Sequence, residues 1–208
     1  MAGDDTGAVR ARVVFVGPMG AGKTTIGKRV ARALGAEFVD SDTEFVRRHG
    51  PIAAYFDLHG EPAFRREERA VVEREVRRDV VLSLGGGAVL DPATRADLAE
   101  VPVVLLTTTA EAVAGRLGSG VRPLVRGGVA DWTRIHEERR PIYEALADTV
   151  VDTSRRPITA LAAEIAAWVR EGRPAQTERP RTDHGTAAGG PAATGSAATT
   201  GRPSGRQS

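Results

Sequence analysis

The sequence predicts an α/β domain built on a parallel sheet. Short apolar runs rich in β-branched residues alternate with longer charged segments of helical periodicity. Several runs are apolar almost throughout, which is typical of parallel strands covered by helices on both faces. A glycine-rich loop also follows the first run and opens a helical segment. We therefore expect strands and helices to alternate along one chain.

The expected strands are residues 12–17, 36–40, 80–85, 101–107 and 148–153. The expected helices are near residues 22–34, 42–58, 61–78, 92–99, 110–117, 131–147 and 157–171. Open parallel sheets bind ligands beyond the carboxyl ends of their strands. Each motif described below falls at such an end.

Composition separates one folded domain from its flanks. Residues 173–208 are mainly Gly, Ala, Pro, Ser and Thr without periodic apolar positions, which predicts a disordered low-complexity tail. We expect residues 1–10 to be flexible and residues 11–172 to form one domain. The tail holds five arginines against two acidic residues, so residues 1–172 carry 24 basic and 25 acidic side chains. The net charge of +2 therefore comes from the tail, and we expect no nucleic-acid partner.

Several classes of protein are excluded or disfavoured by composition. The chain has no cysteine, which rules out disulfides, thiolate metal sites and cysteine nucleophiles. No apolar run reaches membrane-spanning length, and the polar start is unlike a signal peptide. We expect a soluble cytoplasmic monomer with no membrane partner.

The first glycine-rich loop, GPMGAGKTT at residues 17–25, matches the phosphate-binding pattern G-x-x-x-x-G-K-[ST]. Such glycines let backbone N–H groups surround an anion at a helix N-terminus. Lys23 would reach the β- and γ-phosphates, and the Thr24 hydroxyl would ligate Mg²⁺. The pattern predicts binding of ATP or GTP. The residues expected to contact the nucleotide here are Gly20, Ala21, Gly22, Lys23, Thr24 and Thr25.

Two carboxylates end the second apolar run. Asp40 and Asp42 are two residues apart, so on an extended strand both would face one site. Paired carboxylates suit Mg²⁺ organisation or the orientation of an attacking hydroxyl. The alternative is a helix cap supplied by Ser41, Asp42 or Thr43.

Two further features have both a functional and a purely structural interpretation. On a helix, Arg65 and Glu68 share a face, and Arg is suited to gripping a planar carboxylate; the alternative is a surface ion pair. The second glycine stretch, Gly85–Gly87, lets a ligand lie against the main chain, although it also serves as a strand-ending turn.

A third such feature is the segment 115–128, which combines three arginines with five glycines between two helices. This composition is typical of a mobile lid that carries positive charge onto phosphates, or of a plain solvated loop. No Ser-His-Asp set is evident, and phosphoryl transfer needs none because positioning and charge neutralisation carry that chemistry.

Taken in order, the motifs resemble those of shikimate kinases over about residues 11–171. They are GPMGAGKTTIGK, FVDSD, GEPAFRREE, VLSLGGGAV, VRPLV and RRPIY. The resemblance implies a three-layer P-loop kinase fold with a five-stranded parallel sheet, flanking helices and a mobile lid. It also implies transfer of a phosphoryl group from ATP, with Mg²⁺, to the 3-hydroxyl of shikimate, a step toward chorismate and the aromatic amino acids.

The resemblance assigns roles on the acceptor side. Asp42 would bind the acceptor hydroxyls, including the attacking one, while Asp40 would act through the Mg²⁺ water shell. Arg65 and Arg139 would hold the shikimate carboxylate, with Glu68 steadying Arg65. The backbone of Gly85, Gly86 and Gly87 would line the ring pocket, and Ser83 would touch the metal's water shell.

The resemblance also assigns roles on the nucleotide side, including roles for arginines of the lid. Arg122 would reach the transferring phosphate and act with Lys23 and Asp42 in catalysis. Arg116 would lie beside the adenine. In the segment TSRRP, Arg156 aligns with an adenine-side position, with Arg155 as the alternative. The lid is about one residue shorter than in some family members, which bears on its detailed contacts.

Two other functions fit part of the pattern. A related P-loop kinase with another small acceptor, such as a gluconate-type sugar acid, would share the phosphate loop and lid. A nucleotide-binding regulator without turnover would share the loop alone. Arg65, Arg139 and the SLGGGA stretch together favour a cyclic carboxylate as the acceptor over a sugar acid. A complete set of site residues disfavours a regulator without turnover.

Overall fold

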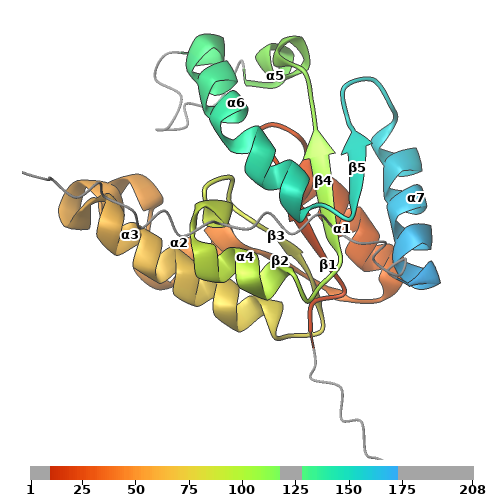
Figure 1. Ribbon diagram of the computed structural model, residues 1–208, viewed down its shortest axis with the longest axis horizontal. Helices are drawn as coiled ribbons and strands as arrows, with labels where there is room; N and C mark the ends of the chain where they lie inside the picture. Colours follow the sequence, from red (N-terminus) through yellow and green to blue (C-terminus); the bar gives the residue numbers. More distant parts are fainter. Residues whose placement is uncertain (1–9, 118–127, 173–208) are drawn as a thin grey trace, which may run out of the picture. The chain divides into compact units, whose positions relative to one another are not determined.

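A computed structural model gives the fold of residues 10–117 and 128–172 (Figure 1). A sheet of five parallel strands has the order β2-β3-β1-β4-β5, as the alternating pattern predicts. The strands are β1 (Val13–Val16), β2 (Glu37–Asp40), β3 (Val80–Ser83), β4 (Val103–Thr107) and β5 (Thr149–Asp152).

Helices follow the strands in turn. They are α1 (Lys23–Leu34), α2 (Ser41–His49), α3 (Ile52–Val76), the 3₁₀ turn η1 (Ala88–Leu90), α4 (Pro92–Leu98), α5 (Ala110–Leu117), α6 (Gly128–Leu146) and α7 (Ile158–Glu171). Within the described ranges, none of these helices has the length and apolarity needed to cross a membrane.

The core lies on both faces of the sheet, because successive strand residues point to opposite sides. In β1, Val14 and Val16 pack into one cluster with α3, α4 and α6, and Val13 and Phe15 pack into another with α1 and α7. Figure 1 accordingly shows α1 and α7 on one face and α4 and α6 on the other. The sheet is thus the middle of three layers, and its three central strands β3, β1 and β4 are buried and apolar almost throughout for this reason.

One predicted helix, residues 42–58, is wrong. The chain forms two helices instead, because Gly50 takes φ 80° and Pro51 follows it. A residue before proline is biased away from helical geometry, so the first helix ends there. A second interruption falls inside α3, where Gly60 has φ 76° and ψ 167°. These breaks fold α2 and α3 beside one another next to the carboxyl end of β2.

Candidate active site

The two glycine-rich loops leave neighbouring strands at the same edge of the sheet. β1 leads into residues 17–22, and β3, its neighbour, leads into Gly85–Gly87. A Cβ built on Gly86 would lie 3.7 Å from the carbonyl oxygen of Gly17. The loops are therefore in near contact, so ligands held by each would lie side by side.

The phosphate loop depends on the backbone freedom of glycine. Gly17, Gly20 and Gly22 have φ of 131°, 82° and 87°, which side-chain-bearing residues rarely adopt. Gly22 is also the N-cap of α1, so the amides of the first turn point into the loop. These dihedrals and the helix start create the anion-binding cradle that the motif predicts.

Lys23 and Thr24 begin α1 inside this cradle. The Lys23 ammonium donates hydrogen bonds to the carbonyls of Gly17 at 2.7 Å and Pro18 at 2.9 Å, which keeps it over the loop. The Thr24 hydroxyl donates to Asp40 Oδ2 at 2.8 Å. A hydroxyl paired with a carboxylate is a donor set that suits Mg²⁺. Among the described residues no group of three or more His, Asp or Glu side chains could enclose a metal ion.

Asp40 and Asp42 do not share an extended strand, contrary to the prediction. β2 ends at Asp40, and Asp42 lies in the first turn of α2. The predicted capping residues are also wrong, because Asp40 itself caps α2 by accepting from the Thr43 amide at 3.2 Å. Ser41 is buried and its hydroxyl accepts from the Gly85 amide at 2.9 Å. The short α2 turn thereby brings Asp42 to the second glycine loop by another route than expected.

Charged side chains surround the backbone of Gly85–Gly87. A Cβ at Gly85 would collide with the Asp42 carboxylate and lie 3.2 Å from Glu68 Oε1. A Cβ at Gly87 would collide with the Arg65 guanidinium. At Gly86 it would lie 3.6 Å from Arg139 Nη1. Four residues expected on the acceptor side thus converge on this backbone from α2, α3 and α6.

Arg65 and Glu68 form an ion pair on α3, with Nη1 donating to Oε2 at 2.7 Å. Glu68 is buried, with 6% of its surface exposed. Burial raises the pKa of Glu68, an effect that Arg65 opposes and the nearby Asp42 reinforces. The pair is therefore more than a surface contact, and it holds a guanidinium over Gly87.

Helix α6 joins both loops through side chains that the sequence did not indicate. Trp132 is buried and its indole N–H donates to the Met19 carbonyl of the phosphate loop at 2.9 Å. The Tyr143 hydroxyl donates to the Gly86 carbonyl at 2.6 Å. Burial raises the pKa of Tyr143, so the group remains a protonated donor. Their spacing of 11 residues, three helical turns, is a signal that could have placed both on one face with Arg139 between them.

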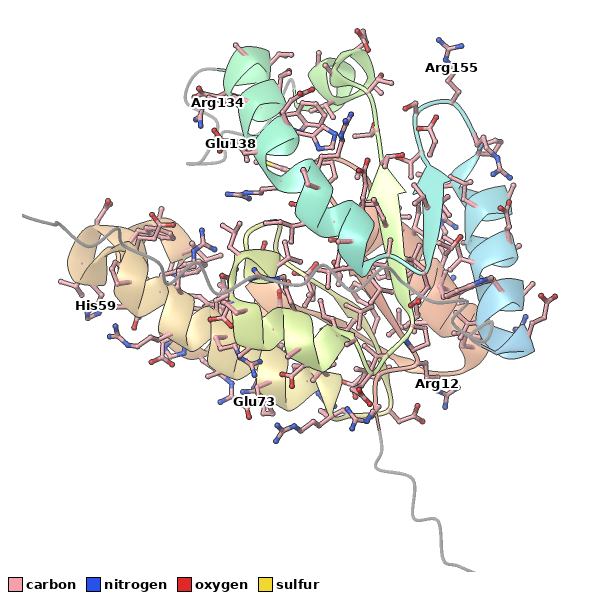
Figure 2. All side chains as sticks on the ribbon, in the orientation of Figure 1. Arg12, His59, Glu73, Arg134, Glu138 and Arg155 are labelled. Carbon is pink, nitrogen blue, oxygen red and sulfur yellow. The ribbon has the colours of Figure 1, made fainter. Side chains whose placement is uncertain are left out.

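Other predicted residues are placed without a test of their role. Ser83 is buried at the end of β3, where it pairs in register with Asp40. Arg156 is exposed and contacts Glu164 at 2.5 Å, while Arg155 projects outward from the β5–α7 connection (Figure 2). Arg122, most of the predicted lid and the side chain of Arg116 lie outside the described part of the chain.

Comparison with known proteins agrees with this geometry. The family model of shikimate kinase matches residues 19–170. The chain belongs to the shikimate kinase family. A shikimate kinase from Mannheimia succiniciproducens is 39% identical over 166 residues, covering 76% of this chain and 94% of that protein. The predicted family is confirmed.

Solved structures extend the comparison. The structure of a shikimate kinase from Acinetobacter baumannii in complex with shikimate matches with a TM-score of 0.73 and 33% identity, over 80% of this chain and 96% of that one. A gluconokinase from Sinorhizobium meliloti matches with a TM-score of 0.55 and 21% identity, over 77% and 92%. The second likeness reflects the shared fold alone. The P-loop kinase fold predicted for this shikimate kinase family member is therefore confirmed.

Proposed function

We propose that the protein transfers the γ-phosphoryl group of ATP to the 3-hydroxyl of shikimate, giving shikimate 3-phosphate and ADP. The observation that carries this proposal is the near contact of the two glycine loops, one shaped for a phosphate and one surrounded by Asp42, Arg65, Glu68 and Arg139. The acceptor would thus lie beside the phosphate that it attacks. The reaction belongs to chorismate and aromatic amino acid biosynthesis, and we expect it in the cytoplasm.

The acceptor would be held through its carboxylate and its hydroxyls. Arg139 lies at Gly86 and Arg65 at Gly87, so two guanidinium groups stand over adjacent glycines, which suits a planar carboxylate. Asp42 lies at Gly85 and would accept hydrogen bonds from the ring hydroxyls, aligning the one that attacks. The bare backbone of Gly85–Gly87 would allow the ring to approach the main chain.

The nucleotide would be held by the cradle at the start of α1. Backbone N–H groups of residues 20–25 would surround the β-phosphate, and Lys23 would move from its carbonyl partners to the β- and γ-phosphates. Thr24 would ligate Mg²⁺, with Asp40 and Ser83 in contact with the metal's water shell. When bound, Mg²⁺ neutralises phosphate charge.

The remaining nucleotide contacts are proposed from the family resemblance. Arg122 would approach the transferring phosphate from the lid, and Arg116 and Arg156 would lie near the adenine. Water would be excluded as the lid closes, which favours transfer to the bound alcohol over hydrolysis.

The direct test is ADP release from ATP and Mg²⁺ with and without shikimate. Shikimate-dependent ADP release by the full chain supports the proposal, and a protein ending at Gly172 should give the same rate if the tail is dispensable. Release that depends on gluconate instead would assign the related sugar-acid kinase activity. Nucleotide binding without any acceptor-dependent turnover would indicate a regulator.

A further inference from the structure

The guanidinium of Arg65 is shared between two carboxylates. Nη1 donates to Glu68 Oε2 at 2.7 Å. Nε and Nη2 both donate to one oxygen of Glu61, Oε1, at 3.2 and 3.0 Å. All three nitrogens of the guanidinium thus have a carboxylate partner on α3 itself. The Nε–Nη2 edge is one that planar carboxylates use for two-point binding.

The two carboxylates differ sharply in exposure. The side chain of Glu68 is 7% exposed and that of Glu61 is 60% exposed, with Arg65 at 24%. Breaking a buried pair leaves an uncompensated charge, whereas an exposed pair is weak and exchanges readily with solvent. Glu68 is therefore the permanent partner of Arg65, and Glu61 is the partner that a ligand can displace.

The backbone places Glu61 for this contact. Gly60 has a positive φ and interrupts α3, and Pro62 follows two residues later, as is common near a helix start. Glu61 therefore lies at the start of the second helical part of α3, where a negative charge is favoured by the helix dipole. One turn later the same segment presents Arg65 above Gly87.

We propose that Glu61 is an internal competitor for the acceptor's carboxylate, occupying the Nε–Nη2 edge of Arg65 until a substrate carboxylate takes its place. This inference rests on the proposed function, in which Arg65 binds that carboxylate. The exchange replaces one carboxylate by another, so the cation beside buried Glu68 is never left without a second anionic partner. It also makes Glu61 a specificity residue, because an alcohol lacking a carboxylate cannot compensate for the displaced contact.

Competition predicts a gain of affinity when Glu61 is removed. While Glu61 occupies Arg65, only the fraction of protein with a free Nε–Nη2 edge can bind the acceptor, and the apparent Kd rises in inverse proportion to that fraction. An exposed ion pair is only a few-fold more populated than its broken form, so this rise is small. We expect Glu61→Gln to lower the KM and Kd for shikimate about two- to sixfold, with the kcat and the KM for ATP unchanged. General damage to the site would move these constants in the opposite direction.

Two further variants separate contact from charge. Glu61→Asp keeps the negative charge but shortens the side chain by one methylene, which weakens its contact with the Nε–Nη2 edge of Arg65, so it should lower the KM by less than Glu61→Gln does. The matched control is Glu73→Gln, which removes another i,i+4 pair, between Glu73 at the end of the same helix and its C-cap residue Arg77 at 3.0 Å. Glu73 points away from the site (Figure 2), and its variant should leave the shikimate KM unchanged.

The experiment measures shikimate binding by calorimetry and steady-state rates on the full chain. A lower KM and Kd in both Glu61 variants, with Glu73→Gln equal to wild type, supports the proposal. An unchanged or raised KM for shikimate in Glu61→Gln overturns it. If wild-type protein releases no ADP with shikimate, the proposed function itself fails, which is a distinct result.

Discussion

The two glycine-rich loops of this protein use the same residue for different physical reasons. In the phosphate loop, Gly17, Gly20 and Gly22 have positive φ, so glycine is needed for its backbone dihedrals. Gly85–Gly87 have no such dihedrals, and glycine is needed there because a Cβ would strike or crowd the side chains above it. The first loop is a self-contained binding element, whereas the second is the floor of a site whose walls come from elsewhere.

This difference determines which substitutions should impair each proposed site. The proposed phosphate cradle lies within one continuous stretch of chain, from Gly17 to Thr25, and would bind an anion mainly through backbone amides. The proposed acceptor site depends on side chains of α2, α3 and α6, beside a loop that is held by contacts such as Ser41 with Gly85 and Tyr143 with Gly86. Substitutions at the second loop should therefore affect acceptor binding without disturbing the nucleotide.

The largest expected effect separates the two sites completely. In the proposed function Asp42 accepts a hydrogen bond from the attacking hydroxyl, and Asp42→Asn would remove that anionic acceptor; groups that act on a reacting proton contribute about 10²–10⁴ in rate. We expect the kcat to fall by that factor while the Kd for ATP, measured by calorimetry, stays within about twofold of wild type because Lys23 and its loop are intact. A normal kcat would remove Asp42 from the acceptor site.

A paired glycine substitution tests the comparison directly. Gly22→Ala forces a side chain into φ 87°, at a cost of about 1–2 kcal/mol, and should weaken ATP binding and lower the free energy of unfolding. Gly87→Ala has no such strain at φ −95° but displaces Arg65, so the shikimate KM should rise about tenfold with the ATP KM unchanged. Thermal unfolding and steady-state kinetics of both variants give the result. The distinction between the two loops would be contradicted if Gly22→Ala raised the shikimate KM and Gly87→Ala weakened ATP binding.

Arg65→Lys tests whether a side chain beside the second glycine loop binds the substrate carboxylate. Lysine retains the charge but not the planar two-point geometry, so the shikimate KM should rise about tenfold, or ~1.4 kcal/mol, with little change in kcat. The matched control is Arg77→Lys, since Arg77 caps the C-terminus of the same helix and forms a similar i,i+4 pair with Glu73, away from the loop. Equal KM values for both variants and wild type would exclude a carboxylate contact at Arg65.

Tyr143→Phe should have the smallest effect. It removes one part-buried hydrogen bond to the Gly86 carbonyl, costing about 0.5–1.5 kcal/mol of stability. Because the loop is also held by Ser41, we expect the shikimate KM to rise only about two- to threefold, with the ATP KM unchanged. Chemical denaturation and kinetics measure the two effects. A larger change in ATP binding than in shikimate binding would contradict this prediction, because it would assign Tyr143 to the phosphate loop.

The sequence by itself determined the alternating α/β order, the parallel sheet, the phosphate loop and the family. These follow from local patterns: apolar runs for two-sided burial, and a contiguous motif whose glycines, Lys23 and Thr24 act where they stand in the chain. Family resemblance also identified Asp42, Arg65 and Arg139, which the structure brings to one loop.

Only the tertiary structure decided how the acceptor site is assembled. The extended Asp40–Asp42 pair was wrong because β2 ends at Asp40, which local periodicity does not fix. The continuous helix 42–58 was wrong for a different reason, because Gly50 and Pro51 interrupt it and this break is a local signal already present in the sequence. The links from Trp132 and Tyr143 join residues far apart in sequence, as does the hydrogen bond between Ser41 and Gly85. Such contacts depend on how helices lie over the sheet, so a pattern read along one chain does not contain them.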